Sequence, residues 1–103
     1  MKIKYYNNAS ILIEHRETKV LFDPWLIGQA NYGSRSIFPE LKVDWSEFDE
    51  LDYICISHIH KDHLHIETLK KISNKVPVVI HNWDDKFVKF SLEKIGKKVI
   101  EIN

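Results

Sequence analysis

The hexapeptide from His58 to His63 combines three imidazoles with one carboxylate and directly follows an apolar run. In an extended chain alternate side chains point the same way, so His58 and His60 can bind one metal ion from one side. Asp62 and His63 then turn towards a second position. Neutral imidazole and carboxylate are ligands of Zn²⁺ and its first-row neighbours, and a catalytic zinc takes about three protein ligands. The spacing therefore predicts a metal site and metal-activated water.

The alternative for a histidine pair in a loop is an ordinary solvated or hydrogen-bonded pair. Four ligand-type residues at this spacing, at the end of a strand, reverse that preference. The other histidines favour structural roles. We expect His65 to be a capping or surface residue, His81 to be a hydrogen-bonded structural histidine unless it edges a pocket, and His15 to be exposed.

On these residues the chain resembles the metallo-β-lactamase superfamily of metal-dependent hydrolases. The signature His-x-His-x-Asp-His is matched at all four positions, by His58, His60, Asp62 and His63. The resemblance extends over residues 3–102. Within the superfamily, residues 8–14 and 22–26 look most like the lactonase-like branch and the branch that contains sialic-acid-nucleotide hydroxylases.

The resemblance implies a role for each residue of the motif. His58 and His60 would hold the first metal, and Asp62 and His63 the second. Asp62 would also be the catalytic residue that orients the water. Asp23, at the end of an earlier strand, would support the metal loop without being a ligand, the alternative being a plain Asp-Pro turn. The implied cofactor is one or two zinc ions, with manganese or iron as alternatives.

The implied reaction is hydrolysis. Metal-bound hydroxide would attack an ester, lactone, phosphoester or similar bond of a small-molecule substrate, because a bound ion lowers the pKa of its water from about 15.7 towards 7. Ser57 either caps the metal loop through its hydroxyl or is an ordinary serine at a strand end. Trp25, Trp45 and Trp83 are expected in core or rim packing.

Hydrophobic spacing and turn residues predict a mixed α/β (α+β) fold, half of an αβ/βα sandwich. An antiparallel meander is followed by strand, helix, strand, helix and strand. The expected strands are residues 3–6, 10–14, 19–22, 53–57, 76–80 and 99–102. The expected helices are residues 66–73 and one that starts at 82–85 and stops at Gly96, with a short helical turn at 46–51 capped by Ser46. Residues 28–36 form a polar loop, either a substrate wall or a plain connector.

Composition sets limits on partners. Fifteen basic residues balance fifteen acidic ones, so nucleic acid and anionic membranes are not the expected partners. The first residues lack the apolar core of a signal peptide, which makes a cytoplasmic protein the default. Cys55 lies in an apolar run and is expected to pack as a small hydrophobe.

The family completes its metal shell with a histidine, an aspartate and another histidine in the second half of the domain. After His81 the chain has no histidine, and Asp84 and Asp85 look like helix-start acids. We therefore expect residues 1–103 to be a single partial domain, catalytically weak alone, that self-associates or needs a completing C-terminal half. The alternative function is a non-catalytic metal-binding fragment or assembly half-domain.

Overall fold

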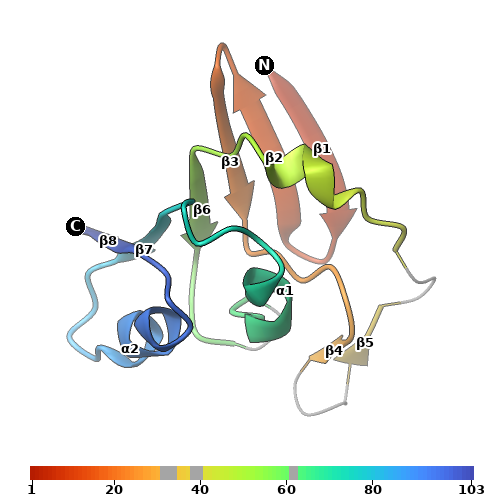
Figure 1. Cartoon of the computed structure of the whole chain (residues 1–103). Coiled ribbons are helices and arrows are strands. Elements are labelled where there is room, and N and C mark those ends of the chain that lie inside the picture. Colours follow the sequence, from red (N-terminus) through yellow and green to blue (C-terminus); the bar gives the residue numbers. More distant parts are fainter. Residues whose placement is uncertain (31–34, 38–40, 61–62) are drawn as a thin grey trace.

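A six-stranded sheet in the order β1-β2-β3-β6-β7-β8 forms the centre of the computed structural model (Figure 1), which describes residues 1–30, 35–37, 41–60 and 63–103. The strands are β1 (Lys2–Asn7), β2 (Ser10–His15), β3 (Thr18–Phe22), β6 (Tyr53–Ile56), β7 (Val78–His81) and β8 (Val99–Ile102). The helices are α1 (Ile66–Lys70) and α2 (Phe87–Lys94), with a 3₁₀ turn η1 (Trp45–Phe48).

The sheet has an antiparallel and a parallel part. β1, β2 and β3 pair antiparallel, whereas β3, β6, β7 and β8 pair parallel. Parallel neighbours need a crossover, and α1 and α2 supply it between β6 and β7 and between β7 and β8. The predicted meander followed by strand, helix, strand, helix and strand is confirmed.

One face of the sheet carries the core. Leu21, Ile54 and Val78 are fully buried there and cluster with Leu69 of α1 and Leu92 of α2. Figure 1 shows η1 crossing in front of β1 and β2, and its Phe48 joins the same cluster. Alternation along each strand sends every second side chain into this layer.

The opposite face of the sheet is also apolar. One row crosses five strands, because neighbouring residues pair in register: Tyr5, Ile11, Phe22, Cys55 and Val79. Tyr5 is 64% exposed, and Ile3 of the next row is 61% exposed. Burial, with a smaller contribution from the Asp23 carboxylate, raises the pKa of the Cys55 thiol, as expected for a packing residue.

Several element ends differ from the sequence prediction. α1 ends at Lys70 instead of Ser73, because the Lys71 N–H bonds to the Thr68 carbonyl and tightens the last turn. α2 begins only at Phe87, two residues after Asp85, whose Oδ1 accepts the Phe87 N–H at 2.8 Å. Its stop at Gly96 is confirmed by a φ of 88°.

Two further predictions, both for residues that precede the predicted metal loop, are wrong in part. The predicted polar loop contains two short paired strands, β4 (Gln29–Ala30) and β5 (Arg35–Ser36), and residues 31–34 lie outside the described part. The helical turn is capped by Asp44 and not by Ser46, since Asp44 accepts the Ser46 N–H. None of the helices in the described part of the chain is long and apolar enough to cross a membrane.

Candidate metal centre

Asp23 anchors the site from the end of β3. Its backbone has a φ of 42°, in the left-handed region that non-glycine residues rarely adopt and that costs of order 1–3 kcal/mol. The Asp23 N–H donates to the Cys55 carbonyl at 2.9 Å, which ties this position to β6. Strain held by such contacts is typical of functional positions.

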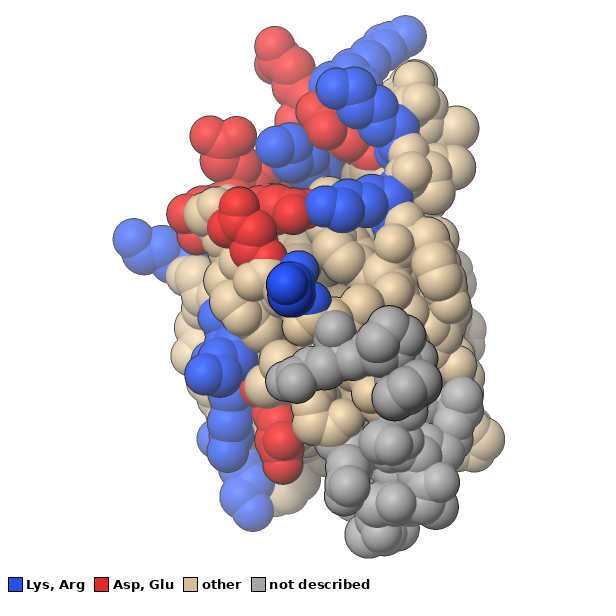
Figure 2. Space-filling model, turned by 90° about the vertical axis from the view of Figure 1, so that its right-hand side faces the viewer, with Lys and Arg blue, Asp and Glu red and all other residues tan. Residues whose placement is uncertain are grey.

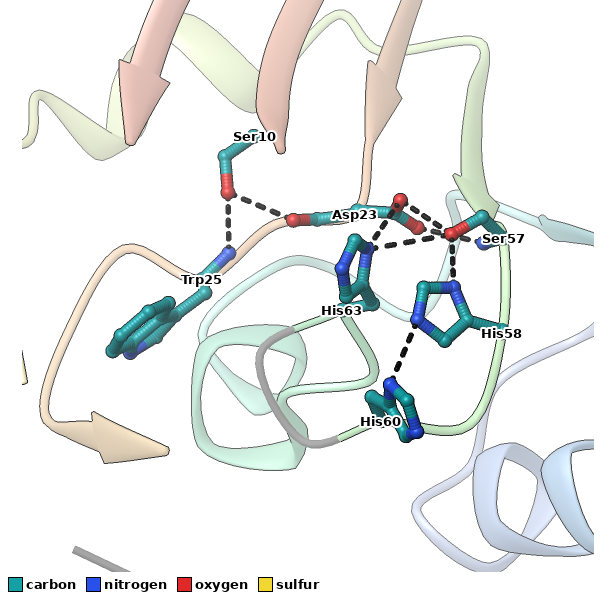
Figure 3. Close-up of polar contacts among 7 residues, drawn as sticks. All are labelled: Ser10, Asp23, Trp25, Ser57, His58, His60 and His63. Carbon is teal, nitrogen blue, oxygen red and sulfur yellow. Dashed lines mark hydrogen bonds and ion pairs between the residues drawn. The ribbon is translucent and has the colours of Figure 1, made fainter. Parts of the chain in front are cut away.

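Ser10 fixes the same turn from β2. Its fully buried hydroxyl donates to the Asp23 carbonyl at 2.7 Å and accepts the Trp25 N–H at 2.8 Å (Figure 3). Trp25 then enters the core, which confirms its expected packing role. The turn at Asp23 is therefore hydrogen-bonded to Ser10 of β2 and to Cys55 of β6.

The Asp23 carboxylate points at the loop that follows β6. Its Oδ1 accepts the Ser57 N–H at 2.6 Å, and its Oδ2 accepts the Ser57 hydroxyl at 2.6 Å. Oδ2 also lies 2.8 Å from His63 Nδ1, and the Asp23 side chain is only 9% exposed. One carboxylate therefore positions both ends of the predicted metal loop.

These hydrogen bonds set the tautomers of two imidazoles. Since the Ser57 hydroxyl donates its proton to Asp23, its oxygen accepts from His58 Nδ1–H at 2.8 Å. Asp23 likewise accepts from His63 Nδ1–H. In both rings the lone pair then resides on Nε2, and metal-binding histidines typically donate their other N–H to such a partner.

His58 and His60 are spaced as two ligands of one ion. His58 Nε2 lies 3.2 Å from His60 Nδ1 (Figure 3). Zinc–nitrogen bonds of about 2.0–2.1 Å place two ligand nitrogens of a tetrahedral site about 3.3 Å apart. This contact is a hydrogen bond in the structure, and its length is also compatible with two ligand nitrogens of one ion. The His63 ring lies beside them, with its centroid 3.9 Å from that of His58.

The ligand set in the described part is incomplete. Asp62, the predicted catalytic residue and ligand, lies outside the described residues. Among residues 1–30, 35–37, 41–60 and 63–103, no three histidine, cysteine or acidic side chains are arranged to hold one ion. The described residues supply one ligand pair and an oriented third ring.

The remaining histidines have the following places. His65 is buried and caps α1, with its Nδ1 accepting the Thr68 N–H, which confirms the capping role. His15 is exposed at the end of β2, as expected. His81 is also exposed, and its ring contacts Trp83 at 5.5 Å. Among the described residues His81 has this ring contact, and its expected side-chain hydrogen bond stays a prediction.

Sequence reasoning missed part of this network. It left Ser57 open between a capping and an ordinary role, and the structure places the hydroxyl between a carboxylate and an imidazole. The pattern placed Ser10 at the start of a strand but predicted no role for its hydroxyl group. A small polar residue that begins an otherwise apolar strand was the available signal, because buried hydroxyls are nearly always hydrogen-bonded.

Comparison with known proteins gives a family match. Residues 2–102 match the family described as the beta-lactamase superfamily domain. The chain is 35% identical over 107 residues to the cytidine monophosphate-N-acetylneuraminic acid hydroxylase of Xenopus laevis, covering all of this chain and 18% of that protein. The chain thus spans about a fifth of the length of this relative.

Solved structures share the fold. An isothiocyanate hydrolase from Delia radicum gut bacteria superposes with a TM-score of 0.78 at 17% identity, over 100% of this chain and 42% of that one. A protein described as a possible metal-dependent hydrolase from Veillonella parvula gives 0.77 at 20% identity, over 97% and 41%.

Proposed function

Because this chain belongs to the beta-lactamase superfamily, we propose that it contributes the metal-binding part of a hydrolase that acts on a small-molecule ester, lactone, phosphoester or similar bond. The observation that carries the proposal is the link from Asp23 through Ser57 to His58. It presents Nε2 of His58 to Nδ1 of His60 at the spacing of two metal ligands.

The residues of this chain have two tasks in the proposed reaction. His58 and His60 hold the first ion, while Asp23 keeps their loop in register with β3. His63 and Asp62 would hold a second ion, and Asp62 would orient the attacking water. When bound, the metal supplies hydroxide at neutral pH and polarises the substrate oxygen. Imidazole ligands favour zinc, with manganese or iron as alternatives.

Metal content together with turnover tests this proposal. The purified chain is loaded with zinc, desalted and analysed for metal, then screened against generic ester, lactone and phosphodiester substrates. The His58→Ala/His60→Ala variant is the reference, with circular dichroism to establish folding. Equal metal content in the two folded proteins would contradict the proposal.

Charge supports a small substrate over a nucleic acid. Acidic and basic residues are equal in number, and on the face in Figure 2 their side chains are interspersed. Nucleic-acid binding requires a concentration of positive charge that neutralises several phosphates. A nuclease activity is therefore the less favoured branch.

A second candidate is oxidative. The Xenopus laevis relative, at 35% identity, is a hydroxylase. Hydroxylation at a metal site requires a redox-active ion, and zinc has no redox chemistry. Activity that is restored by iron but not by zinc, and that depends on dioxygen and a reductant, would favour this candidate over hydrolysis.

The exposed apolar side chains of Ile3 and Tyr5, on the sheet face opposite the core, support association between copies of this chain. An exposed apolar face of this kind drives association, so we propose that the isolated chain self-associates through it unless further polypeptide completes the domain. A chain that self-associates in this way would be an assembly half-domain with weak catalysis. Light scattering on Ile3→Lys tests this, with Phe90→Lys of α2 as control, since both side chains are more than half exposed. An equal change in association for the two variants would contradict self-association through this sheet face.

A further inference from the structure

A cavity of about 430 Å³ lies directly beside the metal loop. It is formed by the loop after β6, the loop after β7 and the start of α2. The lining residues are His58, Ile59, Trp83, Asp84, Asp85, Phe87 and Val88. His58 is also one of the proposed ligands, so a molecule in this cavity would lie next to the metal position.

Most of the lining is apolar. Ile59 is 42% exposed and Phe87 is 47% exposed, and both border the same cavity as the ring of Trp83. Val88, which also lines the cavity, is buried. Exposed apolar side chains that converge on a hollow mark a binding site, and the volume is within the roughly 300–1,000 Å³ of small-molecule sites.

Among the described residues that line the cavity, the charged groups are both carboxylates. Asp85 Oδ1 accepts the Phe87 N–H, so the positive N-terminus of α2 already has an acidic partner. The neighbouring cation, Lys86, is turned away from the cavity, because its Nζ binds Glu101 at 2.7 Å and Asn82 at 2.5 Å. The Asp84 carboxylate is exposed at the rim. In the metal-free chain, the formal charges on the described lining residues are therefore both negative.

We propose that this cavity binds an apolar, ring-sized group of the substrate, and that this group is neutral or cationic. Asp84 and Asp85 would exclude anionic substituents, while Ile59, Trp83 and Phe87 hold the ring. This inference rests on the proposed hydrolase function, since it treats the molecule beside His58 as the substrate. It names a substrate class that the metal loop alone does not specify.

Three probes with one ring and different charge test the proposal. Benzyl alcohol, benzylamine and benzoate are titrated into the metal-free chain of residues 1–103, and the backbone amide signals of residues 83–88 are followed by NMR. We expect the neutral and cationic probes to bind at least tenfold more tightly than benzoate. Metal is left out because a carboxylate would bind it directly.

Matched variants separate ring binding from charge. Phe87→Ser should weaken benzyl alcohol severalfold, whereas Phe90→Ser on the same helix should not. Asp84→Asn/Asp85→Asn should abolish the discrimination against benzoate. The control is Asp49→Asn/Glu50→Gln, which removes the same charge from exposed residues outside the cavity.

Either of two results would overturn the proposal: benzoate binding as tightly as benzylamine, or no shift with any probe. A separate zinc titration distinguishes its failure from that of the hydrolase function. Zinc uptake without probe binding removes the cavity proposal alone. Selective probe binding without zinc uptake removes the hydrolase function and leaves a ligand site of the stated chemistry.

Discussion

Two serine–aspartate pairs in this molecule use the same hydrogen bonds for different purposes. At η1, Asp44 accepts the N–H and the hydroxyl of Ser46. At the metal loop, Asp23 accepts the N–H and the hydroxyl of Ser57. The first pair is two residues apart in sequence and exposed, whereas the second is 34 residues apart and partly buried.

The difference lies in what each pair connects. Asp44 caps the first turn of η1, which lies next to it in the sequence. The hydrogen bonds from Ser46 lower the pKa of the Asp44 carboxyl group. Asp23 joins the end of β3 to the loop after β6 and also accepts from His63. Identical chemistry thus serves as a helix cap in one place and orients imidazoles in the other, because only the second pair bridges distant strands.

The largest expected effect is on metal binding by the imidazole pair. His58→Ala/His60→Ala should reduce the metal content of the folded protein to background, since both proposed ligands of one ion are gone. The matched control is His15→Ala/His81→Ala, which removes two exposed histidines. Elemental analysis after desalting measures both. If the control variant lost its metal and the His58→Ala/His60→Ala variant did not, the metal site would not be at His58 and His60.

Asp23→Asn should lower metal affinity by about 10- to 100-fold, the usual effect of a group that orients ligands. Both carboxylate oxygens accept hydrogen bonds, so either amide orientation would place an NH₂ group against a donor. Asparagine tolerates the left-handed backbone at this position.

A chelator competition measures this affinity, and Asp44→Asn is the control that should leave it unchanged. A similar affinity for all three proteins would mean that the two pairs are equivalent and that Asp23 is only structural.

Ser57→Ala should have a smaller effect, of about tenfold or less in metal affinity. It removes the oxygen between Asp23 and His58 but keeps the N–H that donates to Asp23 Oδ1. Ser46→Ala is the matched control. Isothermal titration with zinc compares the affinities of the two variants. If Ser57→Ala lowered the affinity as much as Asp23→Asn, the Ser57 hydroxyl would account for the whole effect of Asp23 on metal binding.

The smallest effect concerns stability and pH at the η1 pair. The pKa of Asp44 is lowered in the folded protein, so its contribution is present above the unfolded pKa of about 3.9 and is lost as the pH falls through the folded value. Asp44→Ala should therefore lower the unfolding midpoint slightly at pH 7 and have less effect at pH 3. Thermal unfolding followed by circular dichroism tests this, and a larger effect at pH 3 would contradict it.

Local signals were sufficient for much of the fold. Alternation predicted the strands, and Gly96 predicted the end of α2, because these depend on residues close in sequence. Element ends were less well predicted. Asp85 and Asp44 cap positions other than those expected, since capping depends on which backbone N–H a short side chain can reach.

The sequence by itself determined the class of fold and predicted the kind of chemistry. Three imidazoles and an acid within six residues predict a metal loop, because their spacing is local. Only the tertiary structure decided which groups orient those imidazoles. Asp23 and Ser57 meet because β3 and β6 pair side by side, with Phe22 opposite Cys55. A contact between residues 34 positions apart is produced by that pairing, and no local pattern encodes it.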